Sequence, residues 1–386
     1  MSRRFFIAAA AALLAAQPLA AASLDFNDPL RSRQTYLEKL HFPDAWARIY
    51  DLPTRGQVTI AVVDSGFDTH HRDLQWNLIQ GINIVDGSGD VGPVHAHGTG
   101  VIGPIAASSG NGLGISQAAW TAQVMPIRVT NRKDALASVD DLARGIRYAA
   151  DHGAQVINVS YSGVDLPLLE SAARYAQQRG AVVFMPAGND GQWKYGWPNH
   201  KRLVAVGSIT PGGGVSRFSN RGKFVDLVAP GEDFLTLYPD DQYAYWAGTS
   251  FASPVAASVA ALVLTANPGL APWQVRKILF DSAMDLKKPG YDGFTGYGLV
   301  DAAQAVELAL QTTGYYTKHG IAGSIPTVPN DLSHTPGLSL SDVAGHQAPI
   351  LQPQGFITGT FSAPEPQAVV LWLALAGPAV LRRRRR

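Results

Sequence analysis

Short apolar runs rich in β-branched residues recur along the middle of the chain. They cover residues 58–63, 124–129, 156–159, 181–185, 203–206 and 224–228. Runs of this length and composition are typical of strands that are buried on both faces. We therefore expect these segments to form the sheet of one folded domain.

Helical patterns lie between and after these runs. They cover residues 139–152, 168–179, 253–266, 272–283 and 300–310. The segment 253–266 is apolar nearly all round, so this helix should be central and buried. Alternation of strands and helices favours an α/β fold with a mainly parallel sheet. In such folds the functional site lies at the carboxyl ends of the strands.

Composition narrows the chemistry. Of the 386 residues, 46% are apolar and 16% charged, which suits a folded chain. Cysteine is absent, which excludes a disulfide scaffold, a thiolate metal site and a cysteine nucleophile. Without residues 1–22 and 363–386, the chain has 24 basic and 29 acidic residues. This acidic body disfavours a nucleic-acid-binding surface.

The N-terminus has the pattern of a secretory signal peptide. Arg3 and Arg4 precede an apolar run over residues 5–16, and small residues at 20–22 offer a cleavage site before Ser23. A helix of the folded domain is the alternative. Such a helix would be apolar on the side that packs against the core and polar on the other side, and this run has no polar side.

The C-terminus carries a second targeting pattern. Residues 368–381 are an uncharged apolar run, about 21 Å long as a helix and so short for a bilayer core of about 30 Å. Pro-Glu-Pro at 364–366 precedes it, and the arginines at 382–386 would hold its end on the cytoplasmic side. This order resembles the PEP-CTERM sorting signal of Gram-negative bacteria, which implies a transient anchor cleaved by an exosortase. A plain C-terminal membrane anchor is the alternative.

The sequence thus divides into four segments. They are a signal peptide (1–22), a folded domain (23–312), a linker rich in Gly, Pro, Ser and Thr (313–362) and a sorting signal (363–386). We expect an exported protein of the cell envelope or extracellular space of a Gram-negative bacterium. Its processing partners would be signal peptidase and an exosortase-type enzyme, with membrane contact through the C-terminal helix before processing.

Four polar residues stand at the predicted strand ends and helix starts. Asp64 lies in VVDSGFD, His97 in HGTGVIGPIAA, Asn189 in FMPAGND and Ser250 in AGTSFASPVAAS, just before the buried helix. Each has a structural alternative when taken alone: Asp64 and Asn189 suit turns, and His97 and Ser250 suit helix caps. For the helix start, Ser253 and Pro254 have the expected chemistry.

Together the four residues suit nucleophilic catalysis. A serine hydroxyl is a weak nucleophile that needs an adjacent base, which His97 would supply before protonating the leaving amine. Asp64 would fix the imidazole tautomer, while the Asn189 amide and the Ser250 N–H would stabilise the oxyanion. His95 also suggests a His-x-His metal site, but no acidic or cysteine ligand lies at useful spacing. We therefore predict no metal and no cofactor for the chemistry.

The segments VVDSGFD, HGTGV, AGND and GTSFASP resemble the motifs of the subtilisin-like serine proteases, over roughly residues 40–310. The resemblance implies a three-layer α/β fold with helices on both faces of a mainly parallel sheet. It implies a serine endopeptidase that acts on proteins or peptides through an acyl-enzyme on Ser250. Two other classes remain: a catalytically inactive scaffold of the same fold, and a sedolisin-type acid peptidase, which the HGTG segment disfavours.

The resemblance also implies where substrate lies. Ser160, Tyr161 and Ser162 would pair with the substrate backbone, and Gly188 would belong to a pocket wall. Ser162 stands where glycine is usual, which would narrow the pocket entrance.

Other departures from the family pattern are Gly100, in place of a second histidine, and Pro186, which lacks an N–H. About 35 residues separate the predicted signal cleavage from the first strand, fewer than the propeptide of many secreted relatives. Structural calcium is frequent in the family, and the loop 108–114 has oxygen ligands to offer, although no cluster there is diagnostic.

Overall fold

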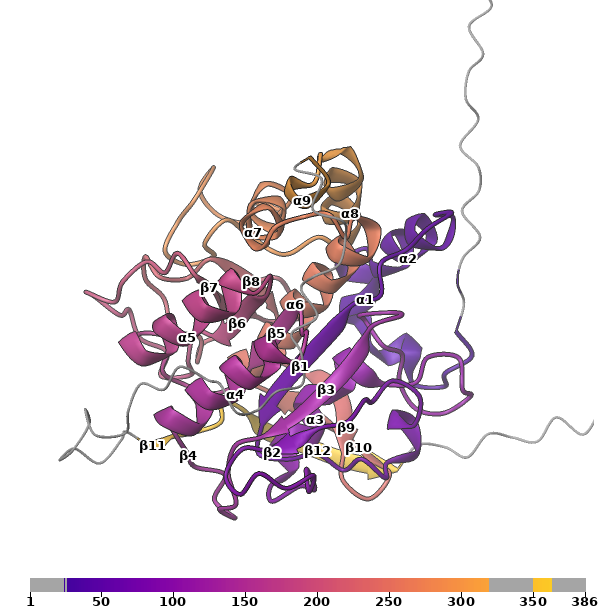
Figure 1. Cartoon of the computed structure of the whole chain (residues 1–386), viewed down its shortest axis with the longest axis vertical. Coiled ribbons are helices and arrows are strands. Elements are labelled where there is room, and N and C mark those ends of the chain that lie inside the picture. Colours follow the sequence, from indigo (N-terminus) through magenta and orange to yellow (C-terminus); the bar gives the residue numbers. More distant parts are fainter. Residues whose placement is uncertain (1–23, 25, 319–349, 363–386) are drawn as a thin grey trace, which may run out of the picture.

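A seven-stranded parallel sheet forms the centre of the protein (Figure 1). The computed structural model describes residues 24, 26–318 and 350–362. Along the sheet the order is β2 (Ile82–Asn83), β3 (Gln123–Arg128), β1 (Thr59–Asp64), β5 (Val156–Val159), β6 (Val182–Pro186), β7 (Leu203–Ile209) and β8 (Leu227–Pro230). Nearly every residue of the inner strands is buried, as their unbroken apolar runs require.

Helices cover both faces of this sheet. One face carries α4 (Val139–Asp151) and α5 (Pro167–Gln178), and the other carries α3 (Ala96–Ala106) and α6 (Thr249–Ala266). Further helices are α1 (Thr35–Lys39), α2 (Phe42–Tyr50), α7 (Pro272–Asp281), α8 (Ala302–Gln311) and α9 (Tyr315–Lys318). The three-layer α/β fold with a mainly parallel sheet is thereby confirmed.

Helix α6 runs through the core, as its apolar pattern predicts. Its residues from Thr249 to Thr265 are all buried. Within the part of the chain that the structure describes, α6 alone is long and apolar enough to cross a membrane, but its surface lies inside the protein. The signal peptide and sorting signal predicted at 1–22 and 363–386 lie outside the described residues.

Two small antiparallel sheets flank the main one. The first has the order β12 (Phe356–Ser362), β10 (Gln242–Ala247) and β9 (Phe234–Tyr238), and the second pairs β11 (Ile350–Leu351) with β4 (Ala137–Ser138). In Figure 1, β12 appears in yellow beside β10. The structure here differs from the linker expected over 313–362, because β11 and β12 pair with strands of the folded domain.

Candidate active site

Asp64 ends β1 as a fully buried carboxylate. Its Oδ1 accepts hydrogen bonds from the Ser65 N–H at 2.7 Å, from the Ser65 hydroxyl at 3.1 Å and from the His97 Nδ1 at 2.9 Å. A carboxylate taken out of water needs such donors to stay charged. The first strand therefore places a hydrogen-bonded carboxyl group on one side of the imidazole.

His97 is the second residue of α3 and is also fully buried. Its Nε2 lies 2.9 Å from the Ser250 Oγ. Because Asp64 accepts from Nδ1, the imidazole carries its hydrogen there and leaves Nε2 as the acceptor for the serine proton. The rings of Trp246 and Phe251 lie against the imidazole, with centroids 6.2 and 5.6 Å away. The proton path is thus shielded from water on the aromatic side.

His95, which suggested a metal site, instead caps α3. Its Nδ1 accepts a hydrogen bond from the His97 N–H at 3.1 Å. Partial burial lowers the pKa of His95, which favours the neutral imidazole that this bond needs. No group of three or more His, Asp or Glu within residues 24, 26–318 and 350–362 could hold a metal ion.

Ser250 lies in the first turn of α6, which begins at Thr249. The expected start at Ser253 was wrong: Pro254 lies inside the helix. Proline lacks the N–H that would bond the carbonyl four residues earlier, which here belongs to Ser250. That carbonyl accepts instead from the Ser160 hydroxyl at 3.0 Å. The sequence pattern gives no sign that the Ser160 hydroxyl takes the place of the missing proline N–H, so the predicted helix start was four residues too late.

Asn158 links β5 to the helical turn that carries Ser250, and the sequence pattern did not single it out. Its Nδ2 donates to the Ser160 Oγ at 2.9 Å, and its Oδ1 accepts from the Ser253 hydroxyl at 2.7 Å. With the bond from Ser160 to the Ser250 carbonyl, this buried chain ties β5 to the first turn of α6. The available signal was a lone amide side chain inside an apolar strand.

Asn189 is held by its side-chain oxygen. Oδ1 accepts from the Thr249 N–H at 3.0 Å and from the Thr249 hydroxyl at 2.8 Å. The same hydroxyl accepts from the Gly188 N–H at 3.2 Å. These bonds leave the Asn189 amide nitrogen as the donor group, which is the role that an oxyanion site needs. Thr249 is a further site residue that the sequence pattern did not indicate.

The predicted substrate segment Ser160–Ser162 pairs with the protein's own C-terminal part. The Gln354 N–H donates to the Ser160 carbonyl at 3.2 Å, and the Ser162 N–H donates to the Gln352 carbonyl at 3.1 Å. Tyr161 forms an antiparallel bridge with Pro353. The structure therefore shows an extended chain lying across Ser250, whose N–H donates to the Gln354 carbonyl at 3.0 Å.

A pocket of about 450 Å³ adjoins this extended chain. Ser162, Gly188 and Asn220 line it together with Gln354. The Gln354 side chain enters the same region, where its Oε1 accepts from the Asn189 N–H at 3.0 Å. The predicted pocket residues thus share one cavity beside Ser250.

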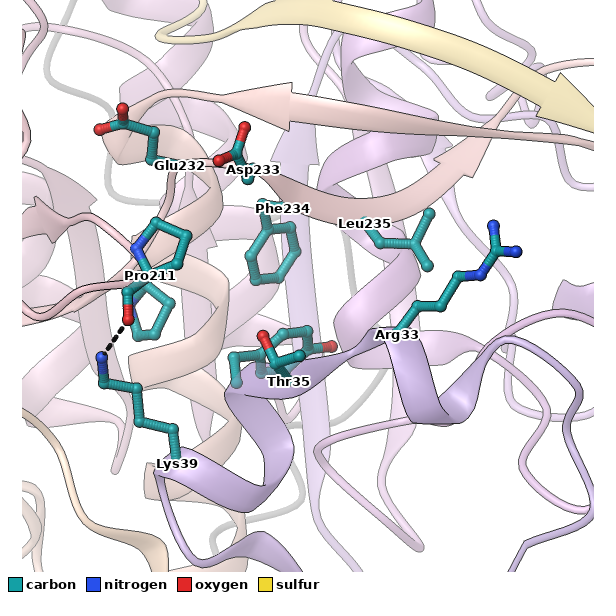
Figure 2. A pocket seen from close by; sticks show the side chains of 10 residues that line it. Arg33, Thr35, Lys39, Pro211, Glu232, Asp233, Phe234 and Leu235 are labelled. Carbon is teal, nitrogen blue, oxygen red and sulfur yellow. Dashed lines mark hydrogen bonds between the residues drawn. The ribbon is translucent and has the colours of Figure 1, made fainter.

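Figure 2 shows another pocket, between α1 and β9. Thr35 and Phe234 lie in its wall, and the Lys39 ammonium donates to the Pro211 carbonyl at 2.7 Å. None of the eight predicted site residues lines it. We therefore place the functional site at the cleft beside Ser250.

Gly100 makes room for an aromatic ring behind the site. A Cβ on Gly100 would lie 2.9 to 3.1 Å from ring atoms of Trp246, which is closer than packed atoms normally come. The departure from the family motif therefore accompanies the aromatic packing beside His97.

Comparison with known proteins places the chain among proteases. The model of the subtilase family matches residues 55–298. Thermitase from Thermoactinomyces vulgaris is 34% identical over 284 residues, covering 73% of this chain and 99% of the relative. The halolysin-like extracellular serine protease Nep from Natrialba magadii is 36% identical over 290 residues, covering 72% of this chain but only 52% of the relative. A solved protease from Pseudoalteromonas arctica superposes with a TM-score of 0.64 at 29% identity, covering 74% of this chain and 99% of the other.

Proposed function

This chain belongs to the subtilase family, and we propose that it is an exported serine endopeptidase with Ser250 as nucleophile. The supporting observation is the buried line from the Asp64 carboxylate through the His97 imidazole to the Ser250 hydroxyl, with successive distances of 2.9 and 2.9 Å. Three side chains so far apart in sequence would not be brought into this order by the needs of packing alone.

The chemistry follows from this line. His97 takes the proton of Ser250 as the hydroxyl oxygen attacks a peptide carbonyl, and Asp64 stabilises the imidazolium that forms. The Ser250 N–H and the Asn189 amide donate to the oxyanion. His97 then protonates the leaving amine, and water hydrolyses the acyl-enzyme by the same proton transfers in reverse.

Protein and peptide substrates would bind as an added strand. Ser160 offers its carbonyl and Ser162 its N–H, which are the main-chain groups that pair with residues 352–354. This mode needs only the substrate backbone, so side-chain preference rests on the pocket beside Gly188. No cofactor is required for the chemistry.

Export and temporary membrane attachment belong to the same proposal. Residues 1–22 support export through a signal peptide, and residues 363–386 support an anchor that an exosortase-type enzyme removes. The word "extracellular" in the name of Nep also supports export. Structural calcium is frequent in the family, and a calcium-binding measurement on the purified protein would test whether the loop 108–114 holds such an ion.

Replacement of the nucleophile tests the proposal. Ser250→Ala should lower casein hydrolysis on the order of a millionfold and abolish labelling by a serine-directed phosphonate. Ser258→Ala is the matched control, because Ser258 is a buried serine of the same helix whose hydroxyl bonds only to the Pro254 carbonyl among the described residues. Circular dichroism would show that both variants fold. Labelling that persists in Ser250→Ala would refute the assignment, and a folded wild-type protein without casein hydrolysis would favour the inactive scaffold.

A further inference from the structure

The C-terminal part of the described chain crosses the active site in an extended conformation and is held on both sides of it. Before the site, β11 pairs antiparallel with β4, with Leu351 opposite Ala137. Beyond the site, β12 pairs antiparallel with β10, with Phe356 opposite Ala247. The residues between these two strands, 352–355, therefore lie directly in front of Ser250.

The register places one peptide bond at the nucleophile. The Gln354 carbonyl oxygen accepts a hydrogen bond from the Ser250 N–H at 3.0 Å, and the Ser250 hydroxyl contacts the same oxygen. A carbonyl polarised by this N–H occupies the position that an oxyanion would take. The carbon that would be attacked is thus the carbonyl carbon of Gln354.

Gly355 lies on the side of the leaving group. A Cβ on this residue would lie 2.7 Å from the Ser250 Oγ and 3.2 Å from the His97 Nε2. Gly355 is therefore packed against the imidazole that would protonate a departing amine. Any side chain at this position would push the chain away from the nucleophile.

The side chains before the bond suit the surfaces they meet. Gln354 places its amide oxygen on the Asn189 N–H, and the half-buried Leu351 packs near Gly163, whose Cβ position would be 2.7 Å from a Leu351 methyl group. Pro353 has no N–H to donate, and the main-chain bonds to Ser160–Ser162 come from its two neighbours. The segment thus loses no pairing bond to its proline.

We propose that the chain is its own substrate and cleaves the bond between Gln354 and Gly355. The inference rests on the proposed function, because it uses Ser250 and His97 in the same roles. The Ser250 oxygen bonds to the Gln354 carbonyl carbon while its proton passes to His97. The carbon–nitrogen bond breaks, and Gly355 leaves as an amine with that proton. Water then adds to the acyl carbon and loses one proton to His97, which passes it to the Ser250 oxygen as Gln354 is released as a carboxylic acid, so one water is consumed.

Cleavage would separate residues 355–386, with the apolar run and the arginines, from the catalytic domain. Before the cut, the segment blocks the cleft to other substrates. After it, residues 352–354 are held on one side only, through β11, so they leave the cleft more easily than a strand held on both sides. Cleavage of this bond would therefore open the site, and in a chain that still carries the anchor it would also separate the catalytic domain from it.

The test compares four full-length proteins. Intact-mass measurement should show the wild-type chain cut into one fragment that ends at Gln354 and one that begins at Gly355, and Ser250→Ala uncut. Gly355→Ala should cut this bond about 100-fold more slowly, because misplacement of about 1 Å at a reacting centre costs about that factor. The control is Gly359→Ala, which should cut at the wild-type rate, since nothing lies within 4 Å of a Cβ at Gly359.

Casein hydrolysis separates the two ways of failing. An uncut wild-type chain beside a Gly355→Ala protein that digests casein would overturn the inference, leaving the segment as an inert plug and the proposed function intact. Equal cleavage rates in Gly355→Ala and Gly359→Ala would also overturn it. Gly355→Ala is the variant whose segment is pushed out of the cleft, so the absence of both casein hydrolysis and phosphonate labelling in this variant would instead refute the proposed function.

Discussion

Thr249→Val should slow catalysis without weakening substrate binding. The Thr249 hydroxyl donates to the Asn189 Oδ1 at 2.8 Å and accepts from the Gly188 N–H at 3.2 Å. Valine has nearly the shape of threonine, so the substitution removes these two bonds and little packing. The Thr249 N–H still donates to Asn189 at 3.0 Å, so the amide loses one of two restraints rather than both.

The expected fall in kcat follows from the two hydrogen bonds that the Thr249 hydroxyl makes. A net hydrogen bond contributes about 1 kcal/mol, and the Gly188 N–H left without an acceptor adds a comparable penalty. If about 1 to 2 kcal/mol of oxyanion stabilisation is lost, kcat should fall about 5- to 30-fold. KM should change little, because the bonds orient a group that acts on the transition state. Thr249→Ser keeps the hydroxyl and should restore kcat.

The assay is steady-state hydrolysis of a soluble peptide by each purified variant. Thr265→Val is the matched control: Thr265 is a buried threonine of the same helix, and its Oγ1 has no hydrogen-bond partner within the described residues. This control should keep the wild-type kcat. A Thr249→Val enzyme within twofold of wild type, or an equal loss in Thr265→Val, would refute the role of Thr249 as a positioning residue.

Three further predictions rest on single contacts. Asp64→Asn should lower kcat about 10⁴-fold, measured on the same peptide, because an amide in place of the carboxylate favours the wrong His97 tautomer. Asn189→Ala should cost about 100- to 1000-fold in kcat by removing an oxyanion donor; an unchanged kcat would exclude that role. Burial raises the pKa of Asp226 to about 7 from 3.8, so the folded chain holds this proton more tightly than the unfolded chain. The protonated Asp226 therefore contributes fully to the free energy of unfolding below about pH 4, and this contribution falls by about 1.4 kcal/mol per pH unit as the pH rises to about 7. Urea unfolding of the Ser250→Ala protein at several pH values should show this fall. The fall should be smaller when Asp226→Asn is added to Ser250→Ala.

The inner strands of the central sheet could be predicted from the sequence, because a strand that is buried on both faces is an unbroken run of apolar residues. The strands expected at 58–63 and 156–159 correspond to β1 (Thr59–Asp64) and β5 (Val156–Val159). The carboxyl ends of parallel strands meet at one edge, so Asp64 and Asn189, which follow strands, could be placed at that edge from the amino-acid pattern. His97 and Ser250 stand at helix starts, and the chemistry of a serine nucleophile and the family resemblance joined them to the group. The distances of 2.9 Å between the three side chains then agree with that grouping.

Prediction from the local sequence pattern failed where a segment's structure depends on a hydrogen bond to a residue far away in the sequence. Residues 356–362 contain glycine and threonine without a clear period, and they become β12 only by pairing with β10 (Gln242–Ala247). Likewise, α6 begins before its apolar run because the Ser160 hydroxyl satisfies the Ser250 carbonyl. Local periodicity carries no information about such donors and edges.

The connections of the central sheet bear on how this protease is made. Strand β1 pairs with β3, where Thr59 is opposite Gln123, and with β5, where Ile60 is opposite Val156. The chain loses conformational entropy when it closes the long loops between these strands, and the stabilising contacts form only afterwards. We therefore expect folding to be slow. Incompletely folded copies would then be present together with folded copies, and their unfolded segments would be easily cleaved. A folded molecule has residues 352–355 in its cleft until it cuts its own chain, so it would not digest these incompletely folded copies during that interval.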